Sequence, residues 1–146
     1  MKGFLLAAAV ICFATSAIAD GHGNKISFEQ RHEGTPMDVT SVHLNSGGGT
    51  ITAEGQMGSY GRTYVTYKLT ARPDGKSGWV EVEGRGAMAD GAFASGAGVG
   101  IYSRDGTTFT IHFLVNMQDG TQNLDEVVFD AYTRELTHDV YMVQYS

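Results

Sequence analysis

Glycine recurs at every second position in two neighbouring stretches of this chain, at Gly84 and Gly86 and then at Gly96, Gly98 and Gly100. Because successive side chains of a β-strand point to opposite faces, this spacing leaves a strip of one sheet face without side chains. Strand glycines of this kind mark bends, bulges or the close approach of another backbone, as the corners of a curved barrel require. An Asp-Gly pair at residues 90–91 separates the two stretches. We therefore predict that residues 77–104 form a hairpin at the bent centre of a small barrel.

The N-terminal residues 1–19 have the order of parts of a secretory signal peptide. Lys2 is followed by an apolar run, and the small residues Ala17 and Ala19 form a cleavage-site pattern. The apolar run is too short for a membrane span. We predict an exported protein, periplasmic or secreted, without a membrane span. Because the only cysteine, Cys12, lies inside this segment, the mature protein is expected to have no disulfide and no thiolate metal site.

The rest of the chain is expected to form one domain. We predict a flexible N-terminus over residues 20–24 and a single β-barrel domain over residues 25–146, a length that suits one domain with a hydrophobic core. The formal net charge is −6 and no run of basic residues occurs. Nucleic acid is therefore not an expected partner.

Strand-like runs with alternating apolar residues fill residues 25–146, and Gly, Pro, Asn and Asp occur between them. The first two runs, joined by a turn at residues 34–36, are expected to form a hairpin. This pattern predicts an all-β fold, a small antiparallel meander of eight or nine strands closed into a barrel, since closure removes the free edges. The runs are 25–33, 37–45, 50–57, 60–71, the two halves of 77–104, 107–117, 124–132 and 135–145.

The apolar face of each run is expected to point into the barrel. This expected interior includes Ile26, Phe28, Phe93, Val99 and Ile101 along with the apolar residues of the other runs. Ligand pockets are apolar with a few convergent polar groups, so residues on this face are candidates for ligand binding: Gln30, His43, Tyr67, Phe113, Phe129 and Met142. An eight-stranded barrel can also be filled by its own side chains, and a hollow or a solid interior both remain open.

Charged residues alternate on the opposite face of the central hairpin, at Glu81, Glu83 and Arg85. If this face lined the lumen, the carboxylates could form an acid–base pair. If it faces solvent, Arg85 pairs with nearby carboxylates such as Glu54, and we favour this alternative because outward faces of antiparallel sheets are commonly charged.

Acidic residues also gather near the C-terminus, without the spacing of a calcium-binding loop. We expect them to form a solvated edge. The residues are Asp125, Glu126, Asp130, Glu135, His138 and Asp139.

Cleavage after Ala19 would place Asp20 at the N-terminus and His22 in third position. The terminal amine, two backbone amides and the imidazole could form a square-planar nitrogen site for Cu(II) or Ni(II). Any chain with histidine in third place has this potential, so chance is the alternative explanation. No organic cofactor is expected.

The stretch from Gly49 to Arg104 resembles the barrel of the allene oxide cyclase and dirigent superfamily. The resemblance depends on the strands with Gly-x-Gly, on the sequence YVTYKLTARPDGKSG, and on GVGIYSRDG before a long apolar strand. It implies an eight-stranded barrel, often trimeric, with an internal ligand cavity, and in the enzymes a cyclisation or coupling steered by shape. No catalytic residue of that family can be matched onto this chain, so catalytic residues stay unknown. A calycin-like barrel is the alternative.

Two functions follow from these expectations. The first is an exported barrel that binds a small, largely apolar molecule in its lumen, where Gln30, His43 and Tyr67 orient polar atoms. Isomerisation or cyclisation of that molecule by positioning is the form that enzymatic activity would take. The second is a non-catalytic envelope protein with a solid barrel that acts through protein contacts. Whether the chain forms a homo-oligomer stays open.

Overall fold

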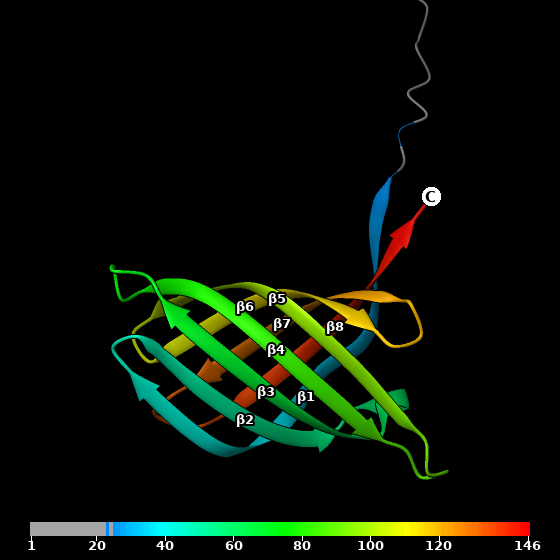
Figure 1. The fold of residues 1–146 in the computed structure, drawn as a ribbon, viewed down its shortest axis with the longest axis horizontal. Helices are drawn as coiled ribbons and strands as arrows, with labels where there is room; N and C mark the ends of the chain where they lie inside the picture. The colour runs from blue at the N-terminus through cyan, green and yellow to red at the C-terminus, as the bar shows by residue number, and fades with distance from the viewer. Residues whose placement is uncertain (1–22, 24) are drawn as a thin grey trace, which may run out of the picture.

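The computed structural model describes Gly23 and residues 25–146. Eight antiparallel strands, each hydrogen-bonded to the next along the chain, form a sheet that closes where β8 pairs with β1 (Figure 1). The predicted meander closed into a barrel is confirmed. The elements are β1 (Ile26–Asn45), β2 (Gly48–Gln56), the 3₁₀ turn η1 (Gly58–Tyr60), β3 (Arg62–Ala71), β4 (Ser77–Ala87), β5 (Phe93–Asp105), β6 (Thr108–Met117), β7 (Gln122–Asp130) and β8 (Leu136–Tyr145).

The predicted signal peptide at residues 1–19 lies outside the described residues, as do Asp20 and His22 of the predicted metal site. Export therefore stays a prediction from the sequence. Within the part of the chain that the structure describes, no helix has the length and apolar character needed to cross a membrane.

The predicted hairpin within residues 25–45 is wrong, because these residues form the single long strand β1. Its pairing with β8 shifts register between Gln30 and His32 and again between His32 and Thr35. Gly34 has a positive φ of 39°, and its N–H donates a hydrogen bond to Asp139 Oδ1 at 2.6 Å. The turn-like residues thus form bulges that bend one strand around the barrel and do not reverse the chain.

The central hairpin is confirmed, with β4 and β5 paired from Ser77 and Ser103 to Ala87 and Phe93. The glycines of β5 face inward. A Cβ atom at Gly100 would overlap the carbonyl oxygen of His112 on β6, so this position admits no side chain. The close approach of the β5 and β6 backbones explains why glycine is required there.

Several residues of the expected interior lie outside. Val99 is 67% exposed and Ile101 is 56% exposed, because they alternate with the inward glycines of β5. Phe93 is exposed for the same reason. Ile26 and Phe28 are exposed because their part of β1 and the end of β8 project beyond the barrel as a two-stranded ribbon, seen in blue and red in Figure 1.

The charged stripe of β4 faces solvent, as favoured from the sequence, with Glu81, Glu83 and Arg85 exposed. The predicted partnership of Arg85 with Glu54 does not form. Glu54 pairs with Arg62 at 2.6 Å, and the Arg85 guanidinium lies 5.1 Å from the ring centroid of Phe93.

Two glycines of the central hairpin provide a matched test of why glycine occurs in these strands. We expect Gly100→Ala to lower the free energy of unfolding by about 3 kcal/mol, because the added methyl group overlaps backbone atoms of β6. A Cβ atom at Gly84 meets nothing closer than Val65 Cγ2 at 3.7 Å. Gly84→Ala is therefore expected to stabilise the barrel by up to about 1 kcal/mol. Urea denaturation measures both values, and equal stability of the two variants would contradict the explanation.

Candidate functional site

One end of the barrel interior is filled with side chains. Tyr102, Phe109 and Phe129 stack there, with ring centroids 5.7 Å and 6.0 Å apart along the series. Towards the middle, Tyr67 and Phe113 meet edge to face at 6.1 Å. All five rings are buried. No ligand could enter from this end without displacing the aromatic core.

The other end of the lumen contains a cavity of about 50 Å³, where Gly84, Gly86 and Gly96 take the place of larger inward side chains. A cavity of this size has room for a few water-sized groups. It adjoins a wider groove of about 440 Å³ at the mouth of the barrel, lined in part by Met88 and Phe93. The cavity and the groove share four lining residues, Tyr60, Ala94, Ser95 and Met117.

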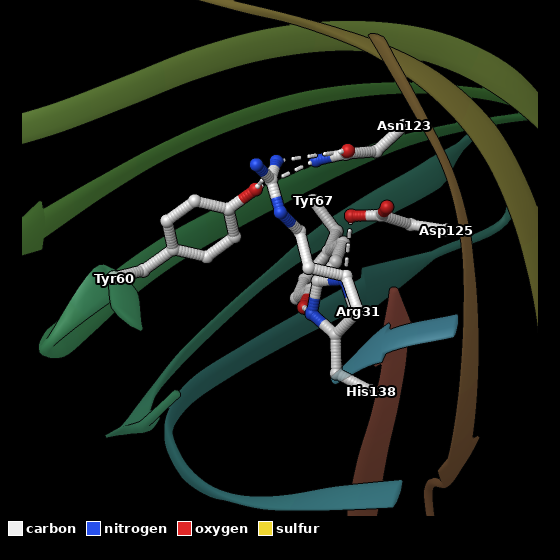
Figure 2. A network of polar contacts seen from close by, with 6 residues as sticks. All are labelled: Arg31, Tyr60, Tyr67, Asn123, Asp125 and His138. Carbon is white, nitrogen blue, oxygen red and sulfur yellow. Dashed lines mark hydrogen bonds and ion pairs between the residues drawn. The ribbon is translucent and has the colours of Figure 1, made fainter. Parts of the chain in front are cut away.

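A buried chain of polar groups from three strands borders the cavity (Figure 2). Tyr67 on β3 extends across the barrel, and its hydroxyl lies 3.0 Å from Nδ1 of His138 on β8. The other ring nitrogen of His138, Nε2, lies 2.8 Å from Oδ2 of Asp125 on β7. Asp125 and His138 are only 5% and 3% exposed, and Tyr67 is completely buried.

The protonation of Tyr67 fixes a consistent direction for these hydrogen bonds. Burial, followed by the negative charge of Asp125, raises the pKa of Tyr67 far above its usual value, so its hydroxyl keeps its proton. The hydroxyl can then donate to Nδ1 of His138, which leaves Nε2–H to donate to Asp125 Oδ2. In this arrangement His138 accepts a hydrogen bond from Tyr67 and donates one to Asp125.

The second oxygen of Asp125, Oδ1, is buried and has no hydrogen-bond partner among the described residues. A buried carboxylate oxygen without a partner is destabilising, because the group has lost its water without replacement. Since Asp125 lines the cavity, a molecule bound there would lie next to this carboxylate.

A second polar cluster, formed by Arg31, Tyr60 and Asn123, lies at the mouth of the cavity (Figure 2). The Tyr60 hydroxyl accepts hydrogen bonds from Arg31 Nη1 at 2.6 Å and from Asn123 Nδ2 at 3.0 Å. Gly86 positions Tyr60, because a Cβ atom there would overlap the Tyr60 carbonyl oxygen, so only glycine lets η1 pack against β4. These contacts hold the Tyr60 ring between the cavity and the groove.

His32 lies beside this cluster, with its ring 5.0 Å from the ring of Tyr60. Partial burial, and then the positive charge of Arg31, lower the pKa of His32 below its usual value, so this side chain is neutral at pH 7. Among the described residues, no group of three or more His, Cys, Asp or Glu side chains is arranged to hold a metal ion.

The structure places some of the sequence-predicted site residues in the lumen and others outside it. Tyr67, Phe113 and Phe129 are buried in the interior, and Met142 is half-buried. The predicted lumenal positions of Gln30 and His43 are wrong, because both side chains are exposed.

The bulges of β1 explain both errors. One register shift lies between Val39 and Ser41, and Val39 and Val42 both pack against the core, so the inward phase changes by one residue between them. This change turns His43 outward. A second shift follows Gln30 and has the same effect on its side chain.

Asp125 and His138 were expected in a solvated acidic edge, and for these two residues that prediction is wrong. The alternation of inward and outward residues along β7 and β8 indicates their true positions. Val127 and Phe129 point inward, and a period of two then places Asp125 on the same face. The same rule applied to Val140 places His138 in the lumen.

Comparisons of this chain with protein-family models, curated proteins and solved structures find no match. The resemblance to the allene oxide cyclase and dirigent superfamily stays a prediction from the sequence. The site is therefore interpreted from its own geometry.

The chain of Tyr67, His138 and Asp125 predicts a specific pH dependence of stability. Tyr67→Phe is expected to lower the free energy of unfolding at pH 8 by about 1–3 kcal/mol, because Nδ1 of His138 loses its buried donor. The folded-state pKa of Tyr67 is raised above that of the unfolded chain. The contribution of Tyr67 to the free energy of unfolding is therefore complete below about pH 10, the usual tyrosine pKa, and is lost as the pH rises further.

The difference in the free energy of unfolding between wild type and Tyr67→Phe should therefore shrink by about 1.4 kcal/mol for each pH unit above pH 10. Urea denaturation of both proteins at pH 8, 10 and 11 measures this change. A difference that stays constant over this range would show that Tyr67 ionises as readily in the folded protein as in the unfolded chain.

Proposed function

We propose that this protein binds a small, largely apolar molecule at the open end of its barrel. The observation that supports the proposal most directly is that a narrow cavity with a buried polar wall lies next to a wider groove at the mouth and shares four lining residues with it. Binding sites are commonly preformed, concave and mostly apolar, with a few convergent polar groups that fix orientation.

The dimensions of the two spaces indicate how such a molecule would lie. The cavity of about 50 Å³ accommodates only a small head group, whereas the groove of about 440 Å³ accommodates a larger body. Met88, Phe93 and Met117 line the groove and would contact that body. Each square ångström of apolar surface that leaves water contributes roughly 25 cal/mol, which favours an apolar body.

Isomerisation or cyclisation of the bound molecule is proposed as an extension of binding. The walls of the cavity would select one conformation of the molecule, and the rate would increase through positioning. Asp125, held by His138, is the group in the cavity best placed to accept a proton.

The rival proposal is action through protein contacts of the outer surface, and the exposed apolar residues of β4, β5 and β6 favour it. Trp79 lies opposite Ile101, and Val99 lies opposite Leu114, on the outer face of the sheet. All four are at least half exposed. Contiguous apolar patches on a protein surface commonly mark interaction sites.

Native mass spectrometry of the protein purified gently from its own host tests the binding proposal. We expect a co-purifying organic mass on the wild-type protein and its loss from Gly84→Val, whose side chain fills the cavity. Ala97→Val is the matched control, because it also introduces a valine side chain, at an exposed position of β5 opposite Glu83.

The control should retain the bound mass. A wild-type protein without any bound mass, together with unchanged binding of small apolar probes by Gly84→Val, would contradict lumenal binding and favour the rival proposal.

A further inference from the structure

The carboxylate of Asp125 restricts the chemistry of a molecule that can occupy the cavity. Its Oδ2 accepts a hydrogen bond from His138, whereas Oδ1 is buried and has no partner in the described part of the chain, and the residue itself lines the cavity. A carboxylate oxygen accepts hydrogen bonds and cannot donate them. The head group of a ligand at this position must therefore be a donor, and a carboxylate head would be repelled.

Within residues 25–146, no cationic side chain bonds to Asp125 Oδ1. Arg31 is the cationic side chain of the nearby mouth cluster, and its Nη1 is directed to Tyr60, Asn123 and Thr121. No hydrogen bond or ion pair joins Arg31 to Asp125 among the described residues. The ionised form of Asp125 thus has one oxygen satisfied by His138 and a second that a cationic donor would satisfy best, since charge-assisted hydrogen bonds are about twice as strong as neutral ones.

The shape of the cavity adds a restriction on size. Its volume of about 50 Å³ admits a primary ammonium group and excludes a bulky cationic head. The neighbouring groove, with Met88, Phe93 and Met117 in its lining, suits an apolar chain or ring attached to that head. The acidic net charge of the chain, −6, also raises the local concentration of cations.

We propose that the ligand of this site is an amphiphilic primary amine, whose ammonium group donates to Asp125 Oδ1 while its apolar body lies in the groove at the barrel mouth. This inference rests on the proposed function, because it names the class of molecule that the lumenal site binds. It assigns Asp125 as the specificity-determining residue and His138 as the residue that orients it.

The experiment compares three probes with the same six-carbon body, n-hexylamine, 1-hexanol and hexanoate, by titration calorimetry at pH 7. The proteins are the wild type, Asp125→Asn and Gly84→Val, with Glu81→Gln as a charge-matched control. Glu81 is exposed on the outer face of β4, so its substitution removes one negative charge away from the lumen. Circular dichroism and thermal melting verify that each variant is folded.

We expect the wild type to bind hexylamine at least about tenfold more tightly than hexanol, and hexanoate least, because only the amine offers a charged donor. Asp125→Asn should lose the preference for hexylamine over hexanol. Glu81→Gln should keep the preference, and Gly84→Val should bind none of the three probes.

Two failures can be told apart. Binding of hexanol as tightly as hexylamine by the wild type, abolished in Gly84→Val, would overturn the amine proposal and leave lumenal binding in place. The same result would arise if an ordered water satisfied Asp125 Oδ1. Equal probe binding by the wild type and Gly84→Val, or none by the wild type, would overturn lumenal binding itself. If Asp125→Asn does not fold, the selectivity of the wild type and of Glu81→Gln decides the question.

Discussion

The close approach of the β5 backbone to β6 is the constraint on which the rest of this barrel depends. Gly98 and Gly100 permit it, because a side chain at either position would overlap a carbonyl oxygen of β6. The tight packing turns Val99 and Ile101 outward and sets the curvature of the wall. Gly84 and Gly96 lie nearer the other end of the same hairpin. A Cβ atom at either position would not come as close to backbone atoms, and the lumen is open there. One glycine pattern therefore supplies both the bend and the space for a ligand.

The barrel geometry brings together the buried hydrogen-bonded chain of Tyr67, His138 and Asp125. A carboxylate in a protein interior is strongly destabilising unless it is paired, so its retention needs an explanation. His138 satisfies one oxygen of Asp125, and Tyr67, which extends across from the opposite wall, satisfies the remaining nitrogen of His138. The second carboxylate oxygen is buried and lacks a partner among the described residues, and Asp125 lines the cavity at the open end of the lumen. Under the proposed function, a bound donor would recover the stability lost at this position, which would connect the energetics of the fold to its use.

Much of the architecture could be predicted from the sequence, because alternation and turn residues determine strands locally. The hairpin of β4 and β5 follows from its glycines and its Asp-Gly turn. The single strand β1 could not be predicted in the same way, since a bulge at Gly34 and a turn there have similar sequences, and only pairing with β8 distinguishes them. The predicted lumenal positions of Gln30 and His43 are wrong for the same reason, because the bulges of β1 change which residues point inward. Asp125 and His138 are different, because strict alternation from Val127 and Val140 places both in the lumen, whereas their polarity alone favours a solvated edge.

The most direct test of this account is a crystal structure at about 1.2 Å resolution of the protein purified gently from its own host, a resolution at which a ligand, water and side chains can be distinguished. We expect continuous electron density that begins within hydrogen-bond distance of Asp125 Oδ1 and extends past Tyr60 into the groove. Density for separate waters only, or a lumen closed by rearranged side chains, would contradict the claim that this end of the barrel is a ligand site.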